Sequence, residues 1–230
     1  MSERLIKSCI NCLVGWKNFK NLSDIEISLV DENRYEAVFK PGENILKQGS
    51  PASNAVFISK GMAKIHIEGH DRKSSILEIV LPSSLIVGPG VHVNAQNSYS
   101  LSALTVVHTC FISLDILNQL VSQNAIFATG LINDLIAKAL TAHNRLVSLT
   151  QKKMPGRLAE ALLFFADQVY HSDVFDIILS RQELGEMTNM AKESVVRILS
   201  EFDKSGILKS ENSKVRILDM DKLRLISEKG

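Results

Sequence analysis

The feature that most constrains this chain is a long stretch with helical periodicity that separates two regions of different pattern. Residues 126–152 contain no glycine or proline after Gly130, and their apolar residues recur at alternating spacings of four and three. This heptad spacing is typical of a helix that packs lengthwise on another helix. The seam consists of Ala128, Ile132, Leu135, Ala139, Ala142, Leu146 and Leu149.

A second apolar face on the same stretch leaves two interpretations open. The helix could be buried within its own domain, or one face could pack on that domain while the other meets a partner helix. The second face consists of Leu131, Ile136, Leu140 and Val147.

The region before this helix has the pattern of a small β domain. Apolar, β-branched runs at residues 55–58, 63–67 and 75–81 alternate with glycine and proline turn signals between residues 39 and 113. Many short strands at such spacing predict a β-barrel or β-roll.

Two short helices are expected to flank the β domain. Residues 22–36 have helical character, with Ser23 as the N-cap and Glu26 in capping-box spacing. Ser113 is expected to open a second short helix after the last strand.

The region after the long helix begins at a proline. Pro155 disfavours helical geometry at Met154 and suits the first turn of a new helix, so we place a hinge and a domain boundary there. The new helix is expected to cover residues 157–170.

Further on, two short helices are joined by a tight turn. Ser180 and Glu183 have the spacing of a capping box, which starts the first helix. Asn189 tolerates the left-handed conformation of a sharp turn, and Gly206 ends the second helix. This arrangement predicts a helix-turn-helix, followed by a β-hairpin wing at residues 207–218.

The polar side of the second helix carries groups that can read DNA bases. Arg197 can donate two hydrogen bonds to guanine, Glu193 can accept one from cytosine, and Val196 can touch a thymine methyl group. Lys192 lies on the same side. Alone, Glu193 and Arg197 could be merely a surface ion pair. On the second helix of a helix-turn-helix, base reading is the favoured interpretation.

The composition describes a folded globular protein. Hydrophobic residues make up 45% of the chain, charged residues 22%, and the formal net charge is +1, so any basic surface for nucleic acid must be local. We find no apolar run of the roughly 18–20 residues that span a membrane, and no signal-peptide pattern. The sequence therefore predicts a cytoplasmic protein without a membrane partner.

Six segments match, in order, the motifs of one known family. They are KPGENILKQG at residues 40–49, VFISKG at 56–61, RLAEALL at 157–163, RQE at 181–183, the helix from Glu193 to Arg197, and DKSGIL at 203–208. Together they resemble the CRP/FNR family of bacterial transcription regulators, in which a cyclic-nucleotide-type β-roll precedes a winged helix-turn-helix. The resemblance implies a homodimer that binds a palindromic operator in double-stranded DNA and works with RNA polymerase.

The resemblance also assigns roles to residues. It implies a parallel homodimer whose interface is formed by Ile132, Leu135, Ala139, Ala142, Leu146 and Leu149. It implies DNA contacts by Arg181, Gln182, Lys192, Glu193, Ser194, Val196 and Arg197.

These patterns combine into an α+β architecture of four parts. We expect a cysteine-containing leader at residues 1–20 and a sensor β-roll domain, like a cyclic-nucleotide-binding jelly roll, at 21–124. A dimerisation helix follows at residues 125–153, and the winged helix-turn-helix DNA-binding domain occupies 154–230.

The resemblance breaks where members of the family bind cyclic AMP. Those members use a Gly-Glu step and an Arg-Ser pair, whereas this chain has VGPG at residues 87–90 and NSYS at 97–100. Both charged anchors are missing, and an uncompensated phosphate in a mostly apolar pocket is costly. We do not expect cyclic AMP to be the effector, whose identity stays open.

Three cysteines suggest another signal. Cys9, Cys12 and Cys110 resemble the metal ligands of the oxygen-sensing, FNR-like branch, which hold an iron–sulfur cluster. That branch uses a further leader cysteine, and Asn18 stands near its expected place, so one chain cannot supply four thiolates. Two alternatives remain: a thiol redox sensor, or a leader without ligand and a small buried residue at Cys110.

The main rival function is a ligand-binding regulatory β-roll module without a transcriptional role. The helix-turn-helix argues against this rival, because such modules end without a recognition helix. We find no glycine-rich phosphate loop, no nucleophile–histidine–acid arrangement and no paired carboxylates on one element. The sequence therefore does not predict an enzyme.

Overall fold

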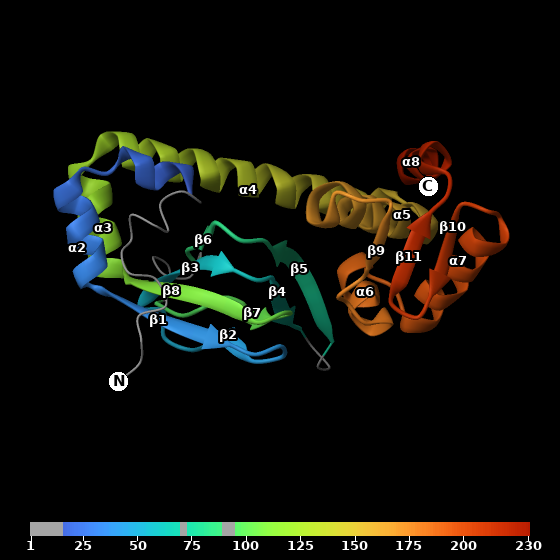
Figure 1. Ribbon diagram of the computed structural model, residues 1–230, viewed down its shortest axis with the longest axis horizontal. Helices are drawn as coiled ribbons and strands as arrows, with labels where there is room; N and C mark the ends of the chain where they lie inside the picture. The colour runs from blue at the N-terminus through green and yellow to red at the C-terminus, as the bar shows by residue number, and fades with distance from the viewer. Residues whose placement is uncertain (1–15, 70–72, 89–94) are drawn as a thin grey trace. The chain divides into compact units, whose positions relative to one another are not determined.

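The structure, a computed structural model, describes residues 16–69, 73–88 and 95–230. It divides into two compact units (Figure 1). The first comprises Met1–Lys73 and Leu77–Ala139, and the second comprises Ser74–Ile76 and Leu140–Gly230. The long helix α4 (Ala125–Gln151) contributes to both units.

The first unit is a β-roll of two four-stranded sheets, as predicted. One sheet has the order β1-β8-β3-β6 and the other the order β2-β7-β4-β5. The predicted runs correspond to β3, β4 and β5, and the third run extends one residue beyond the end of β5 at Val80. The strands are β1 (Arg34–Phe39), β2 (Asn44–Leu46), β3 (Asn54–Lys60), β4 (Ala63–Glu68), β5 (Ser74–Val80), β6 (Ser84–Ile86), β7 (Ser100–Ala103) and β8 (Val107–Ser113).

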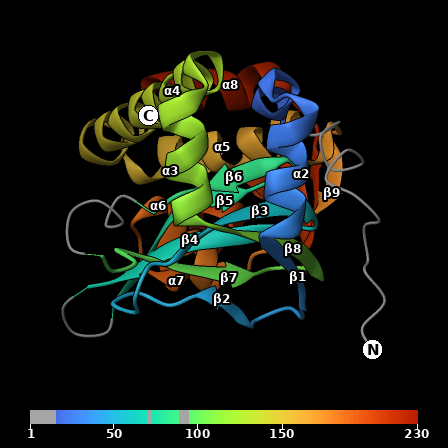
Figure 2. The ribbon, with the colours of Figure 1, turned by 90° about the vertical axis from the view of Figure 1, so that its left-hand side faces the viewer.

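Apolar side chains fill the roll and cover one of its sheets. The interior cluster includes Val56, Ile58 and Leu101, all buried. Three helical segments close the outer face of the β1-β8-β3-β6 sheet over a second cluster that includes Phe57 and Cys110 (Figure 2). These segments are η1 (Lys17–Asn21), α2 (Asp24–Glu32) and α3 (Leu114–Gln123).

The helices that flank the roll begin where the sequence predicted. Ser23 and Glu26 form the expected reciprocal capping box of α2, and Ser113 caps α3. The prediction that the first helix continues to residue 36 is wrong. Its last residue is Glu32, because the chain from Arg34 pairs with β8, where its backbone groups find partners in the sheet.

Helix α4 contacts the β-roll with only part of its surface. Phe127 is fully buried, and Lys138 Nζ donates to the Leu85 carbonyl at 3.2 Å. Of the second apolar face, which could have packed on the β-roll, only Leu131 does so. The exposed apolar surface is therefore broader than the predicted seam. Its large members are Ile132, Leu135, Ile136, Leu140, Leu146 and Val147, which are 48–61% exposed.

The length and composition of α4 would also suit a membrane span. It has 27 residues, and its most apolar window has a mean hydropathy of 1.3. The prediction that the chain has no apolar run long enough to span a membrane is therefore wrong for this helix. By itself such a helix is weak evidence for a membrane. Asp134 and Lys138 interrupt its apolar surface. Asp134 accepts a hydrogen bond from Trp16 and Lys138 donates one to Leu85 of the β-roll, as expected of a helix in a globular domain.

The second unit is a winged helix-turn-helix, as predicted. Pro155 lies in the first turn of α5, and the helix expected at residues 157–170 continues into a π-helical turn. Three strands form a small sheet of order β10-β11-β9. The elements are α5 (Met154–Phe164), η4 (Phe165–Tyr170), β9 (Val174–Asp176), α6 (Arg181–Thr188), α7 (Lys192–Lys204), β10 (Leu208–Glu211), β11 (Lys214–Ile217) and α8 (Met220–Lys229).

Candidate DNA-binding surface and sensor residues

The turn between α6 and α7 is built from local sequence signals. Ser180 and Glu183 form the predicted capping box that starts α6. Asn189 ends the helix with φ of +51°, the left-handed conformation that was expected. At Gly185 a Cβ atom would lie 2.5 Å from the Met190 carbonyl oxygen, so only glycine lets α7 enter so close to α6.

Helix α7 buries one stripe and exposes the opposite side. Its buried residues are the four that the sequence pattern indicates, Val195, Ile198, Leu199 and Phe202. Val196 is 50% exposed, so it adds an apolar group to the outer face of the helix. The remaining sequence-predicted side chains on α7 are exposed at Lys192, Glu193 and Arg197 and half-buried at Ser194.

Arg197, the basic group at the centre of this surface, forms a weak ion pair. Arg197 Nη1 donates to Glu201 Oε1 at 2.7 Å, and both side chains are more than half exposed. The alternative pairing of Arg197 with Glu193 is therefore not the one formed. An exposed ion pair contributes only about 0.2–1 kcal/mol, so a guanine can replace Glu201 at little cost.

Arg181 has a different environment from the residues of α7. It is half-buried and donates to Ser210 Oγ at 3.0 Å and to the carbonyl oxygen of Asn212, at the tip of the wing. Burial lowers the pKa of its guanidinium, although arginine remains charged in proteins. Arg181 therefore joins the start of α6 to the wing.

A second contact holds the wing from the end of α7. Asp203 accepts from the backbone N–H of Ser210 at 3.2 Å and from Lys209 Nζ at 2.8 Å. These hydrogen bonds hold the pKa of the Asp203 carboxyl below its usual value. Arg181 and Asp203 thus fix one wing strand to both helices.

Gln182, the remaining predicted contact residue on α6, is exposed and donates to Glu186 at 3.3 Å.

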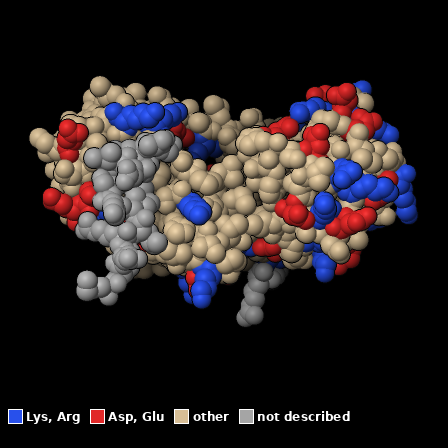
Figure 3. Space-filling view, in the orientation of Figure 1, with Lys and Arg blue, Asp and Glu red and all other residues tan. Residues whose placement is uncertain are grey.

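The charge on the second unit is mixed in sign. In the face shown in Figure 3, Lys and Arg side chains alternate with Asp and Glu over the helix-turn-helix and the wing. The net charge of +1 for the whole chain agrees with this picture. Attraction to phosphate must therefore come from a few well-placed cations.

In the sensor roll, polar and aromatic groups occupy the positions of the missing nucleotide anchors. Asn97 is buried, and its amide donates to Ser50 Oγ at 3.0 Å and to the Pro51 carbonyl at 3.3 Å. Tyr99 packs into the interior cluster. Burial, with a smaller contribution from the charge of Glu78, raises the pKa of its phenol well above the usual value. No described residue at these positions offers a cation.

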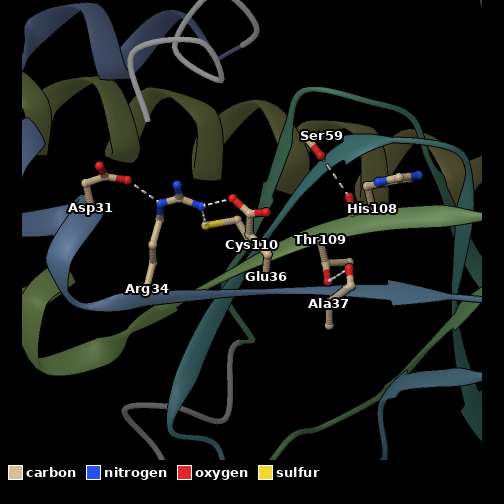
Figure 4. Close-up of polar contacts among 8 residues, drawn as sticks. All are labelled: Asp31, Arg34, Glu36, Ala37, Ser59, His108, Thr109 and Cys110. Atoms are coloured by element: carbon tan, nitrogen blue, oxygen red, sulfur yellow. Dashed lines mark hydrogen bonds and ion pairs between the residues drawn. The ribbon is translucent and has the colours of Figure 1, made fainter. Parts of the chain in front are cut away.

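Cys110 lies beside a buried charged cluster (Figure 4). Arg34, whose side chain is 3% exposed, donates to Asp31 Oδ1 at 2.7 Å and to Glu36. Its Nη1 also lies 3.7 Å from Cys110 Sγ. Glu36 and Cys110 are direct cross-strand partners in the β1–β8 pairing, so both side chains lie on one face of the sheet.

The other two predicted metal ligands, Cys9 and Cys12, lie outside the described residues. Within the described part of the chain, no group of three His, Cys, Asp or Glu side chains is arranged to hold a metal ion. Trp16, the first described residue, belongs to the same apolar cluster as Cys110. Cys12 stands four positions before Trp16 along the chain, and four residue steps span at most about 14 Å.

Two charged groups that form bonds within the first unit were not predicted from the sequence: Arg34, whose side chain is 3% exposed, and Asp134, whose side chain is 25% exposed. Arg34 was assigned to a helix, and Asp134 was passed over as a polar residue in an apolar stretch. The signals were available, because a single acidic residue in a long apolar helix needs a partner. Asp134 finds one in Trp16, whose indole Nε1 donates to it at 2.8 Å.

Known proteins match both units. The profile of the cyclic nucleotide-binding domain matches residues 36–124, and that of the Crp-like helix-turn-helix domain matches residues 156–226. The CRP-like cAMP-activated global transcriptional regulator of Mycobacterium tuberculosis is 21% identical over 215 residues, covering 89% of this chain and 93% of that protein. The transcriptional activator protein anr of Pseudomonas aeruginosa is 24% identical over 184 residues, covering 78% and 75%.

A solved structure shows the same fold. FixK2 of Bradyrhizobium japonicum superimposes with a TM-score of 0.76 at 18% identity, covering 84% of this chain and 96% of FixK2. Both domain profiles, in this order, together with relatives from the CRP and FNR-like branches, place the chain in the CRP/FNR family of transcription regulators. Both named relatives are transcription regulators.

Proposed function

We propose that this protein binds a palindromic operator as a homodimer, with one copy of α7 reading each half-site. The observation that carries the proposal is the exposed face of α7, where Val196 is half exposed and Arg197 has only an exposed partner. This face combines a guanine-reading cation, the Glu193 carboxylate and an apolar group. Lys192 and Ser194, at the start of the helix, and Gln182 on α6 would contribute contacts to DNA.

The homodimer would form along the exposed seam of α4. Ile132, Leu135 and Leu146 expose about half of their side chains, and monomeric proteins rarely leave such a continuous apolar stripe in water. Heptad spacing suits a parallel pair of helices. Ala139 and Ala142 would let the two helices approach closely, and Leu149, which is half-buried, would end the interface. RNA polymerase is the further partner proposed for the DNA-bound dimer in the cytoplasm.

Substitution of Arg197 tests the DNA-binding proposal. Arg197→Ala should cost about 1–3 kcal/mol per half-site at one G·C pair and relax specificity there. Fluorescence anisotropy with a selected operator and with operators changed at single positions measures the effect. Lys222→Ala, on α8, is the matched control. If Arg197→Ala binds the selected operator and each changed operator with the same affinities as the wild type, the role of α7 is contradicted.

A contact with phosphate should behave differently from base reading. If Lys192 contacts phosphate, Lys192→Ala should weaken binding to all duplexes alike and flatten the dependence of affinity on salt. The same anisotropy series, repeated at several salt concentrations, separates the two kinds of contact.

For the sensor, the proposed ligand is an iron–sulfur cluster bound by Cys9, Cys12 and Cys110. The residues fit in kind: Cys110 supplies a thiol, and the Arg34 guanidinium beside its sulfur can donate an N–H to a thiolate or a sulfide. When bound, such a cluster would supply an oxygen-labile centre. The Asn97 and Tyr99 positions, which offer no cation to a phosphate, support an effector other than cyclic AMP.

A further inference from the structure

The first described residues of the chain are bonded to a single aspartate on α4. Trp16 Nε1 donates to Asp134 Oδ2 at 2.8 Å, and Asn18 Nδ2 donates to the same oxygen at 2.6 Å. Lys17 Nζ lies 3.4 Å from Asp134 Oδ1. Trp16 and Asn18 are 6% and 3% exposed and the Asp134 side chain is 25% exposed, so these hydrogen bonds to a charged acceptor are partly shielded from water. We call Trp16, Lys17 and Asn18 the N-terminal latch.

A glycine on α4 makes room for the latch. A Cβ atom at Gly130 would lie 2.3 Å from Asn18 Oδ1 and 2.7 Å from Asn18 Cγ. Gly130 precedes Asp134 by four residues, so both lie on one face of the helix. Glycine weakens a helix interior by about 0.5–1 kcal/mol. The close approach of Asn18 explains why glycine nevertheless occupies position 130.

The same face of α4 makes further contacts within the first unit. Phe127 packs edge-on against Trp16, with ring centroids 5.8 Å apart, and Lys138 bonds to the roll. Leu135 directly follows Asp134, about 100° further round the helix, and is 48% exposed. The rotation of α4 about its own axis therefore decides whether Leu135 faces outwards.

We propose that Trp16 and Asn18 are positioning residues for the dimer. They hold α4 at the rotation that presents Ile132 and Leu135 to a partner copy, and the inference rests on the proposed homodimer. Asn18 stands near the place where the family resemblance calls for a further cysteine. Its amide is committed to Asp134, so this position serves to dock the helix rather than to ligate a metal.

Two substitutions remove the latch by different routes. Asn18→Ala deletes a donor to Asp134, and Gly130→Ala pushes the Asn18 amide out of its niche. Each should raise the dimer dissociation constant by about tenfold, the factor expected from one hydrogen bond to a charged group. The double variant should be no worse than Asn18→Ala alone, because the new methyl group then has space. Sedimentation equilibrium measures the dissociation constants.

A matched control separates positioning from stability. Val30→Ala removes buried volume from the same apolar cluster, so it should lower Tm without changing the dimer dissociation constant. If the dissociation constant follows Tm across all variants, or if Asn18→Ala leaves it unchanged, the inference is overturned.

The fluorescence of Trp16, the sole tryptophan, reports on the latch independently of the dimer. In a Leu135→Asp background, Trp16 should be shielded from acrylamide, and adding Asn18→Ala should expose it. If the wild type sediments as a monomer, the homodimer proposal fails and the positioning role fails with it. If the wild type is dimeric and Asn18→Ala exposes Trp16 without weakening the dimer, only the inference fails.

Discussion

Leu135→Asp should convert the protein to a monomer that no longer binds its operator. In the proposed dimer, each copy would place a carboxylate in an apolar seam, where two charges without partners cost several kcal/mol. Leu146→Asp should act in the same way further along α4. Analytical ultracentrifugation measures the change in oligomeric state, and anisotropy with the operator measures the loss of binding.

A substitution of equal exposure elsewhere provides the control for this result. Val106 is 50% exposed, against 48% for Leu135, and lies in the turn between β7 and β8. Val106→Asp should leave the dimer intact. If both α4 variants remain dimeric with unchanged affinity, the seam has been placed on the wrong surface.

Cys110→Ser should abolish the proposed iron–sulfur cluster. Three thiolates leave one iron position to a different ligand, so the loss of one more should prevent stable assembly. Serine keeps nearly the same volume beside Arg34, so the roll itself should stay folded. The measurement is the visible absorption, iron and acid-labile sulfide of protein reconstituted without oxygen.

A conservative change on the same strand controls for damage to the fold. Ile112 is buried two residues from Cys110, and Ile112→Val should keep the cluster. Absorption that is absent from both the wild type and Cys110→Ser, or equally present in both, would contradict the proposed cluster. The thiol-sensing interpretation would then be the one to examine.

The sequence predicted most of the fold because its signals are local. The capping boxes at Ser23 and Ser180, the left-handed turn at Asn189 and the buried stripe of α7 follow from propensity and periodicity, and the structure has each of them. The strand at residues 34–36 was missed because its conformation depends on pairing with β8, far along the chain.

The candidate site was predictable only in part, for a related reason. Side chains on the outer face of α7 follow from helix geometry alone, whereas the partners of Arg181 do not. Arg181 bonds to the wing, which lies about thirty residues further along the chain. The contact of Asn18 with Asp134 likewise joins residues 116 positions apart. Such long-range pairs follow from the topology and leave no periodic trace in the sequence.

Selection of binding sites from random double-stranded DNA tests whether the protein reads a palindromic operator as a homodimer. A homodimer with one α7 per half-site should return an inverted repeat whose half-sites lie about one helical turn, roughly 10 base pairs, apart. Each half-site should contain one invariant G·C pair whose preference is lost in the Arg197→Ala protein. An asymmetric motif, or no enrichment over the starting pool, would contradict the account.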